Sequence, residues 1–89
     1  MFTSWGVETV KKFTKQEIEN ALNQLKDEEK YGVILRAKGI VQGQDGAWIH
    51  FDYVPDGVDV RLGGASYTGR LCVIGSKIDE EALKALFGV

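Results

Sequence analysis

The residues best suited to chemistry in this 89-residue chain are one histidine, one cysteine and nearby carboxylates. His50 and Asp52 are two positions apart, a spacing that puts both side chains on the same face of a β-strand. With Cys72 they would form a three-ligand metal site if their strands adjoin, so His50, Asp52 and Cys72 are the metal-ligand candidates. The single cysteine excludes a disulfide framework and a CxxC motif. The simpler interpretation of Cys72 is a buried small hydrophobe, because free cysteines usually play that part.

Other catalytic patterns are weaker. Ser66, His50 and Asp52 contain the residue types of a hydrolase triad, but no nucleophile elbow surrounds Ser66. The Gly63-Gly64 loop lacks the lysine followed by Ser or Thr that defines a phosphate loop. We therefore expect no enzyme activity in this chain. A small enzyme with His50 as its base remains the alternative, and it would require a pocket around that residue.

One stretch, Gly32 to Val54, must position these side chains, and its pattern predicts a long β-hairpin. Asp45-Gly46 lies at the centre, where a tight hairpin turn requires a positive φ. Strict alternation predicts one buried face and one face in contact with water or a partner. The expected buried set is Val33, Leu35, Ala37, Val41, Ala47, Ile49, Phe51 and Tyr53, and the other face carries Ile34, Arg36, Lys38, Gln42, Trp48, His50 and Asp52.

The second face is the candidate functional surface. Its partner-binding candidates are Arg36, Lys38, Trp48, His50 and Arg61. Tryptophan and arginine are favoured at the centres of protein interfaces, so docking of another protein surface is the preferred interpretation. A plain solvated face with cross-strand charge pairs is the second, and a nucleic-acid or small-ligand platform is the third. A net charge of −2 argues against non-specific nucleic-acid binding, so we expect a protein partner and no nucleic acid.

Two helices are expected to cover the buried face of the sheet. Thr14 and Glu17 form a capping-box pattern, and Phe13 can pack on Ile18 as a hydrophobic staple. This helix should end between residues 27 and 30. The second helix begins with Asp79 as its N-cap and ends at Gly88. The apolar stripes are Ile18, Ala21, Leu22 and Leu25 in the first helix, and Ala82, Leu83, Leu86 and Phe87 in the second.

The remaining segments complete the expected order β-α-β-β-β-β-α. An edge strand is predicted over Phe2 to Thr9, and two further strands over residues 58–62 and 70–75. Pro55 and Gly57 predict a turn between strands, with Gly57 in the left-handed conformation. This order favours an α+β two-layer sandwich, with a mainly antiparallel sheet of four to five strands and both helices on one face. We expect one domain over residues 1–89, cytoplasmic and without membrane contact, because no apolar run approaches about 20 residues.

In combination, several segments resemble the C-terminal domain of CobW-type proteins, the P-loop GTPases linked to cobalamin synthesis and metal delivery. The similarity extends over most of the chain. Its main pieces are Phe2-Thr3-Ser4-Trp5, the helix start Phe13 to Ile18, the strand Val33 to Gly39 (VILRAKG), and Arg70 to Gly75 (RLCVIG) leading into Asp79 to Leu83 (DEEAL).

The resemblance implies an accessory or recognition domain that packs on the GTPase domain or helps to choose the client protein or metal. It implies no catalytic residue here and no cofactor in this chain. GTP, Mg and Zn or Co would belong to the GTPase domain, which this sequence does not contain, and the family's histidine-rich tails are also missing. A small metal-binding protein using His50 with Asp52 or Cys72 is the alternative.

Overall fold

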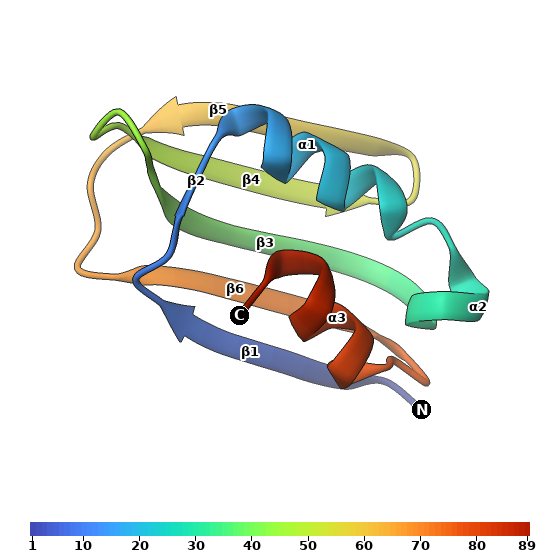
Figure 1. Cartoon of the computed structure of the whole chain (residues 1–89). Helices are drawn as coiled ribbons and strands as arrows, with labels where there is room; N and C mark the ends of the chain where they lie inside the picture. The colour runs from blue at the N-terminus through green and yellow to red at the C-terminus, as the bar shows by residue number, and fades with distance from the viewer.

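The computed structural model describes all 89 residues, arranged as six strands and three helices (Figure 1). In chain order the elements are β1 (Thr3–Thr9), β2 (Lys12–Phe13), α1 (Lys15–Gln24), α2 (Glu28–Tyr31), β3 (Val33–Gly43), β4 (Trp48–Val54), β5 (Gly57–Gly63), β6 (Gly69–Ser76) and α3 (Glu80–Phe87). None of the helices combines the length and the apolar character needed to cross a membrane.

The strands form one sheet in the order β1-β6-β3-β4-β5, and every neighbouring pair in this order is antiparallel. The short strand β2 pairs in parallel with the end of β3. Figure 1 shows the helices on one side of the sheet, with α1 over β4 and β5 and α3 over β6 and β1. The predicted α+β two-layer arrangement is therefore confirmed, and the helices leave the opposite face of the sheet uncovered.

The core lies between the sheet and the helix layer. Seventeen hydrophobic residues are buried in one cluster, and no buried side chain is polar or charged. Phe87 of α3 stacks with Trp5 of β1 and with Phe51 of β4, at 6.5 Å between ring centroids in each pair. The apolar stripes of both predicted helices contribute to this layer, through Ile18, Ala21, Leu22 and Leu25 and through Leu83 and Phe87.

Both predicted helix starts are confirmed. The Thr14 hydroxyl accepts a hydrogen bond from the backbone N–H of Glu17, and the Glu17 carboxylate accepts one from the N–H of Thr14. The Asp79 carboxylate accepts from the N–H of Ala82, and Gly88 ends α3 in the left-handed conformation. These local bonds satisfy backbone donors that have no partner within a helix.

The first helix ends earlier than predicted. Helix α1 stops at Gln24, and the expected final turn is a separate one, α2. The cause is Asp27, which is extended and whose carboxylate accepts a hydrogen bond from the N–H of Lys30, thereby starting a new helical turn. The two-residue strand β2 also escaped prediction, because so short a segment carries no alternating pattern.

The predicted faces of β3 are wrong at its start. Ile34 is buried at 3% exposure, whereas Val33 and Leu35 are exposed at 40% and 36%. The pairing of β3 with β6 shifts register between Ile34 and Arg36, which marks a β-bulge or a similar irregularity there. An extra residue reverses the alternation, so simple period-two counting assigns residues before the bulge to the wrong face.

The two turns next to β4 have different outcomes. Gly46 has a φ of 89°, as the Asp45-Gly46 prediction requires. Gly57 is not among the residues with positive φ, and it pairs with Val54 as the first residue of β5. The prediction of a left-handed Gly57 is therefore wrong, because the chain returns to the sheet through Pro55 and Asp56 alone.

Candidate functional site

The uncovered side of the sheet, called the open face below, carries side chains in register across five strands. Ile40 of β3 lies directly between Arg70 of β6 and His50 of β4, and His50 in turn lies opposite Arg61 of β5. The next row contains Cys72, Lys38, Asp52 and Asp59 in the same strand order. The antiparallel pairing therefore brings together residues as far apart in the chain as Lys38 and Cys72, which are separated by 34 positions.

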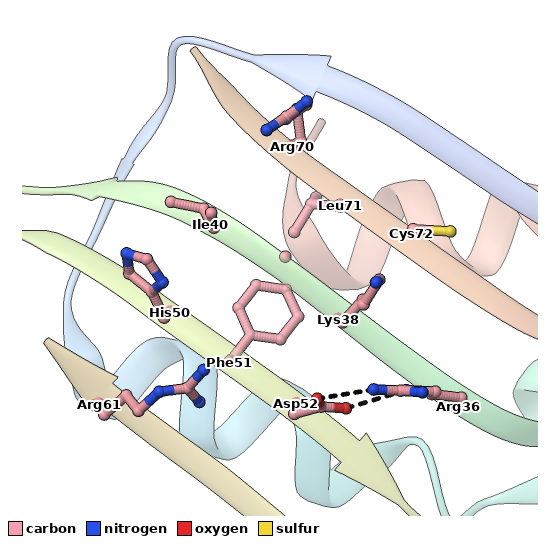
Figure 2. Close-up of a pocket in the computed structure, with 11 residues that line it drawn as sticks. Arg36, Lys38, Ile40, His50, Phe51, Asp52, Arg61, Arg70, Leu71 and Cys72 are labelled. Carbon is pink, nitrogen blue, oxygen red and sulfur yellow. Dashed lines mark hydrogen bonds and ion pairs between the residues drawn. The ribbon is translucent and has the colours of Figure 1, made fainter. Parts of the chain in front are cut away.

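A shallow hollow of about 490 Å³ occupies the middle of the open face (Figure 2). Four Lys and Arg side chains and one Asp are among its lining residues, which gives it a formal charge of +3 although the whole chain carries −2. Its lining consists of Arg36, Lys38, Gly39, Ile40, His50, Phe51, Asp52, Arg61, Arg70, Leu71 and Cys72. The hollow is thus a locally cationic region with partly apolar walls.

Arg36 and Asp52 form a two-pronged ion pair at one end of the hollow, drawn as dashed lines in Figure 2. The distances are 3.3 Å from Nε to Oδ1 and 3.1 Å from Nη2 to Oδ2. The hydrogen bond from Arg36 holds the pKa of Asp52 below its usual value, and Asp52 raises the pKa of Arg36. Asp52 is directly opposite Lys38 in register, yet its carboxylate binds the diagonal neighbour Arg36.

A second pair joins Arg61 and Asp59, which are two positions apart on β5. Arg36 and Arg61 are therefore each paired with a carboxylate of the domain itself. Lys38 and Arg70 form no such ion pair, although Glu8 of the edge strand β1 is opposite Arg70 in register. Both side chains are exposed. They are the cations of the hollow that have no carboxylate within salt-bridge distance.

His50 is fixed by the backbone that follows β5. Its Nε2 atom lies 2.8 Å from the carbonyl oxygen of Gly64, and a carbonyl can only accept, so Nε2 donates in this bond. A Cβ atom at Gly63 would approach the His50 ring to 2.6 Å, so the absence of a side chain there lets the ring lie against the strand. This arrangement makes His50 part of the wall, with one ring nitrogen already used.

The three metal-ligand candidates are not brought together. Cys72 is on β6 and His50 on β4, with β3 between them, and Lys38 stands between Cys72 and Asp52 in register. Asp52 is also engaged by Arg36. The structure contains no group of three or more His, Cys, Asp or Glu side chains placed to hold a metal ion. Similarly, the hydrogen-bond partner of His50 is Gly64 and not Ser66, so the triad residues do not form a relay.

Four of the five partner-binding candidates line the hollow: Arg36, Lys38, His50 and Arg61. Trp48 is half-buried outside it, one row further along β4 and opposite Gln42 and Gly63. Arg70 belongs to the lining and was not among the candidates. In β6 the residues Arg70, Cys72 and Ile74 alternate with the buried Leu71 and Val73. This alternation is the pattern that assigns Arg70 to the open face.

Comparison with known proteins agrees with this architecture. The structure is similar to the crystal structure of the Zn(II)-bound YjiA GTPase from E. coli, with a TM-score of 0.75 and 22% identity, covering 98% of this chain and 29% of that chain. A Zn(II)-bound triple mutant of YjiA GTPase gives a TM-score of 0.77 at the same identity and coverage. No curated protein sequence matches.

The chain is therefore an α+β domain with the fold of one portion of a larger GTPase chain, and it spans less than a third of that chain's length. Its sequence matches the family described as the cobalamin synthesis protein cobW C-terminal domain over residues 2–89. The chain belongs to this family. The resemblance found in its strand and helix-start motifs is thereby confirmed.

Proposed function

We propose that this domain is an accessory and recognition domain of a CobW-type, metal-handling GTPase, and that it docks the GTPase domain or a client protein through its open face. In this proposal GTP, Mg and the delivered Zn or Co are held by the GTPase domain. The cobW C-terminal family and the fold shared with part of a zinc-bound GTPase support the parent class.

The observation that carries the docking role is the asymmetry of the sheet. One face is sealed by three helices over a 17-residue core, while the other has no covering element. The open face nevertheless presents apolar surface, because Ile74 is exposed at 37% and Ile40 and Trp48 are only half-buried. Apolar and cationic side chains mixed on an uncovered face are typical of surfaces that become the centre of an interface.

The size of the open face suits a contact between domains. Five strands spaced about 4.8 Å apart, each with about seven residues rising about 3.3 Å, give a face of roughly 19 Å by 23 Å. That is about 450 Å² on this side and about 900 Å² for both partners, which falls within the roughly 600–1,500 Å² of interfaces between domains. Tethering of the two domains in one chain would strengthen such an interface through a high effective concentration.

The same geometry argues that the domain performs no chemistry of its own. His50 is the one candidate base. Its Nε2 atom donates to the Gly64 carbonyl, which leaves Nδ1 as the ring nitrogen that could accept a proton. The hollow is open, and its acidic group Asp52 is neutralised by Arg36. A general base needs a free nitrogen within reach of a bound substrate, in a site that orients that substrate. A recognition role requires neither.

A nuclear magnetic resonance titration tests the docking role. The isotope-labelled domain is titrated with its cognate GTPase domain, and we expect backbone amide signals of β3, β4 and β6 to shift while those of α1 and α3 stay in place. The method detects affinities into the millimolar range, so weak docking is included. An absence of shifts, or shifts confined to the helix layer, would remove the open face as the docking surface.

A further inference from the structure

We propose that the surface seated on the hollow is an acidic patch of the GTPase domain, whose carboxylates pair with Lys38 and Arg70. This inference rests on the proposed docking function and adds the chemistry of the partner. Lys38 on β3 and Arg70 on β6 are diagonal neighbours in the antiparallel pairing, because Arg70 lies opposite Ile40 and Lys38 lies opposite Cys72.

Diagonal positions of this kind are about 7–8 Å apart, close enough for the two like charges to repel each other. A carboxylate placed between them would relieve that repulsion and pair with both cations. Asp52 does not serve this purpose, because its two oxygens are bound to Arg36. The domain therefore leaves two adjacent cations on its open face whose charge a partner can satisfy.

The distribution of charge favours separate acidic side chains over a continuous polyanion. The carboxylates Glu8 and Asp59 are on the two edge strands β1 and β5, on either side of the cationic hollow. A nucleic-acid backbone crossing the face would meet both of them, whereas a compact acidic patch would fill the middle and avoid the edges. Trp48, the aromatic residue available for base stacking, lies outside the hollow.

A small phosphate ligand fits less well for a different reason. Strong phosphate sites use several backbone N–H groups aimed at the anion, usually from a glycine-rich loop or a helix start. Most of the lining comes from β6, β3 and β4, which are interior strands paired on both sides, so their amides are directed toward neighbouring strands. Ile40 and Cys72 add apolar surface that suits contact with protein side chains.

The test is a binding titration of the cognate GTPase domain with variants of this domain. The double variant Lys38→Glu and Arg70→Glu is expected to weaken binding at least about tenfold, since close charge pairs at interfaces contribute at that level or above. Raising NaCl from about 50 mM to about 500 mM should weaken wild-type binding and leave the double variant little changed.

Two controls separate this effect from changes in net charge or folding. Lys15→Glu with Lys26→Glu makes the same change of charge on exposed residues of the helix side, and should alter affinity less than about twofold. The second control is the far-ultraviolet circular dichroism spectrum of each variant, which should match that of the wild type if the variant is folded. Should the double variant fail to fold, the single variants Lys38→Gln and Arg70→Gln provide the same comparison.

The outcomes distinguish this inference from the docking role itself. If the GTPase domain still shifts the amides of the open face but the Lys38 and Arg70 variants bind like wild type, the acidic-patch inference is overturned and docking stands. If no open-face binding occurs, both are overturned. Tighter binding of inorganic pyrophosphate or of single-stranded DNA than of the GTPase domain would identify a phosphate ligand and would also overturn it.

Discussion

Gly39 of β3 lies between the open-face residues Lys38 and Ile40, and its own side-chain position is on the core side of the sheet. A Cβ atom there would clash with the carbonyl oxygen of Arg70 and would approach the Phe51 ring to 2.6 Å. The first neighbour is backbone of the paired strand β6, which cannot move without disturbing the sheet. The missing side chain therefore lets β3 pass closely beneath Phe51, in the strand that carries Lys38.

We expect Gly39→Ala to lower the free energy of unfolding by about 1–3 kcal/mol, the usual cost of overpacking. Gly64→Ala is the matched control, because a Cβ atom there meets nothing within 4 Å and the residue does not have positive φ. Urea unfolding of both variants measures the difference. Equal stability of the two would show that the sheet accommodates the extra methyl group.

At the scale of elements, the helix layer explains why one face of the sheet is closed. Helix α3 has only eight residues, so it depends on packing for its stability. Phe87 supplies that packing through Trp5 and Phe51, and the Lys11 ammonium donates a hydrogen bond of 2.8 Å to the Phe87 carbonyl. These contacts hold the end of α3 over β1, β6 and β4.

Phe87→Ala should therefore destabilise the domain by about 3–5 kcal/mol, a large share of the roughly 5–15 kcal/mol typical of a domain. Phe2→Ala is the control, because Phe2 is 65% exposed and its loss should change stability by less than about 0.5 kcal/mol. Thermal unfolding followed by circular dichroism compares them. A Phe87→Ala variant as stable as Phe2→Ala would contradict the assigned packing role.

At the scale of the whole molecule, the sheet and the helix layer share one core and are expected to unfold as one unit. The buried residues form a single cluster, and no buried side-chain polar atom lacks a hydrogen-bond partner. Trp5 is in that cluster, whereas Trp48 is on the open face. The chain thus contains one tryptophan on each side of the sheet, so tryptophan fluorescence can measure whether the two sides unfold together.

We expect a single cooperative unfolding transition, as for most small domains. Urea curves of the Trp48→Phe variant report on Trp5, and those of the Trp5→Phe variant report on Trp48. Within each variant the fluorescence midpoint should coincide with the midpoint from far-ultraviolet circular dichroism. Open-face fluorescence that changes well before the loss of secondary structure would show that the sheet and the helix layer unfold separately.

The sequence by itself determined the layers and most of the local structure. Capping residues at Thr14 and Asp79, the Asp45-Gly46 turn and period-two alternation act over a few neighbouring residues, so each can be read without knowing the fold. The same alternation correctly placed Arg36, Lys38, His50 and Arg61 on the uncovered face.

Only the tertiary structure decided which of these charged side chains are paired within the domain and which are left to contact a partner. The bulge after Ile34 and the order of the strands depend on pairing between distant segments, and these set every lateral neighbour. That pairing separates Cys72 from His50 and joins Asp52 to Arg36. It also leaves Lys38 and Arg70 as diagonal neighbours with no carboxylate within salt-bridge distance. Charge pairing is a property of distances across strands, and a linear pattern contains no such distances until the register is fixed.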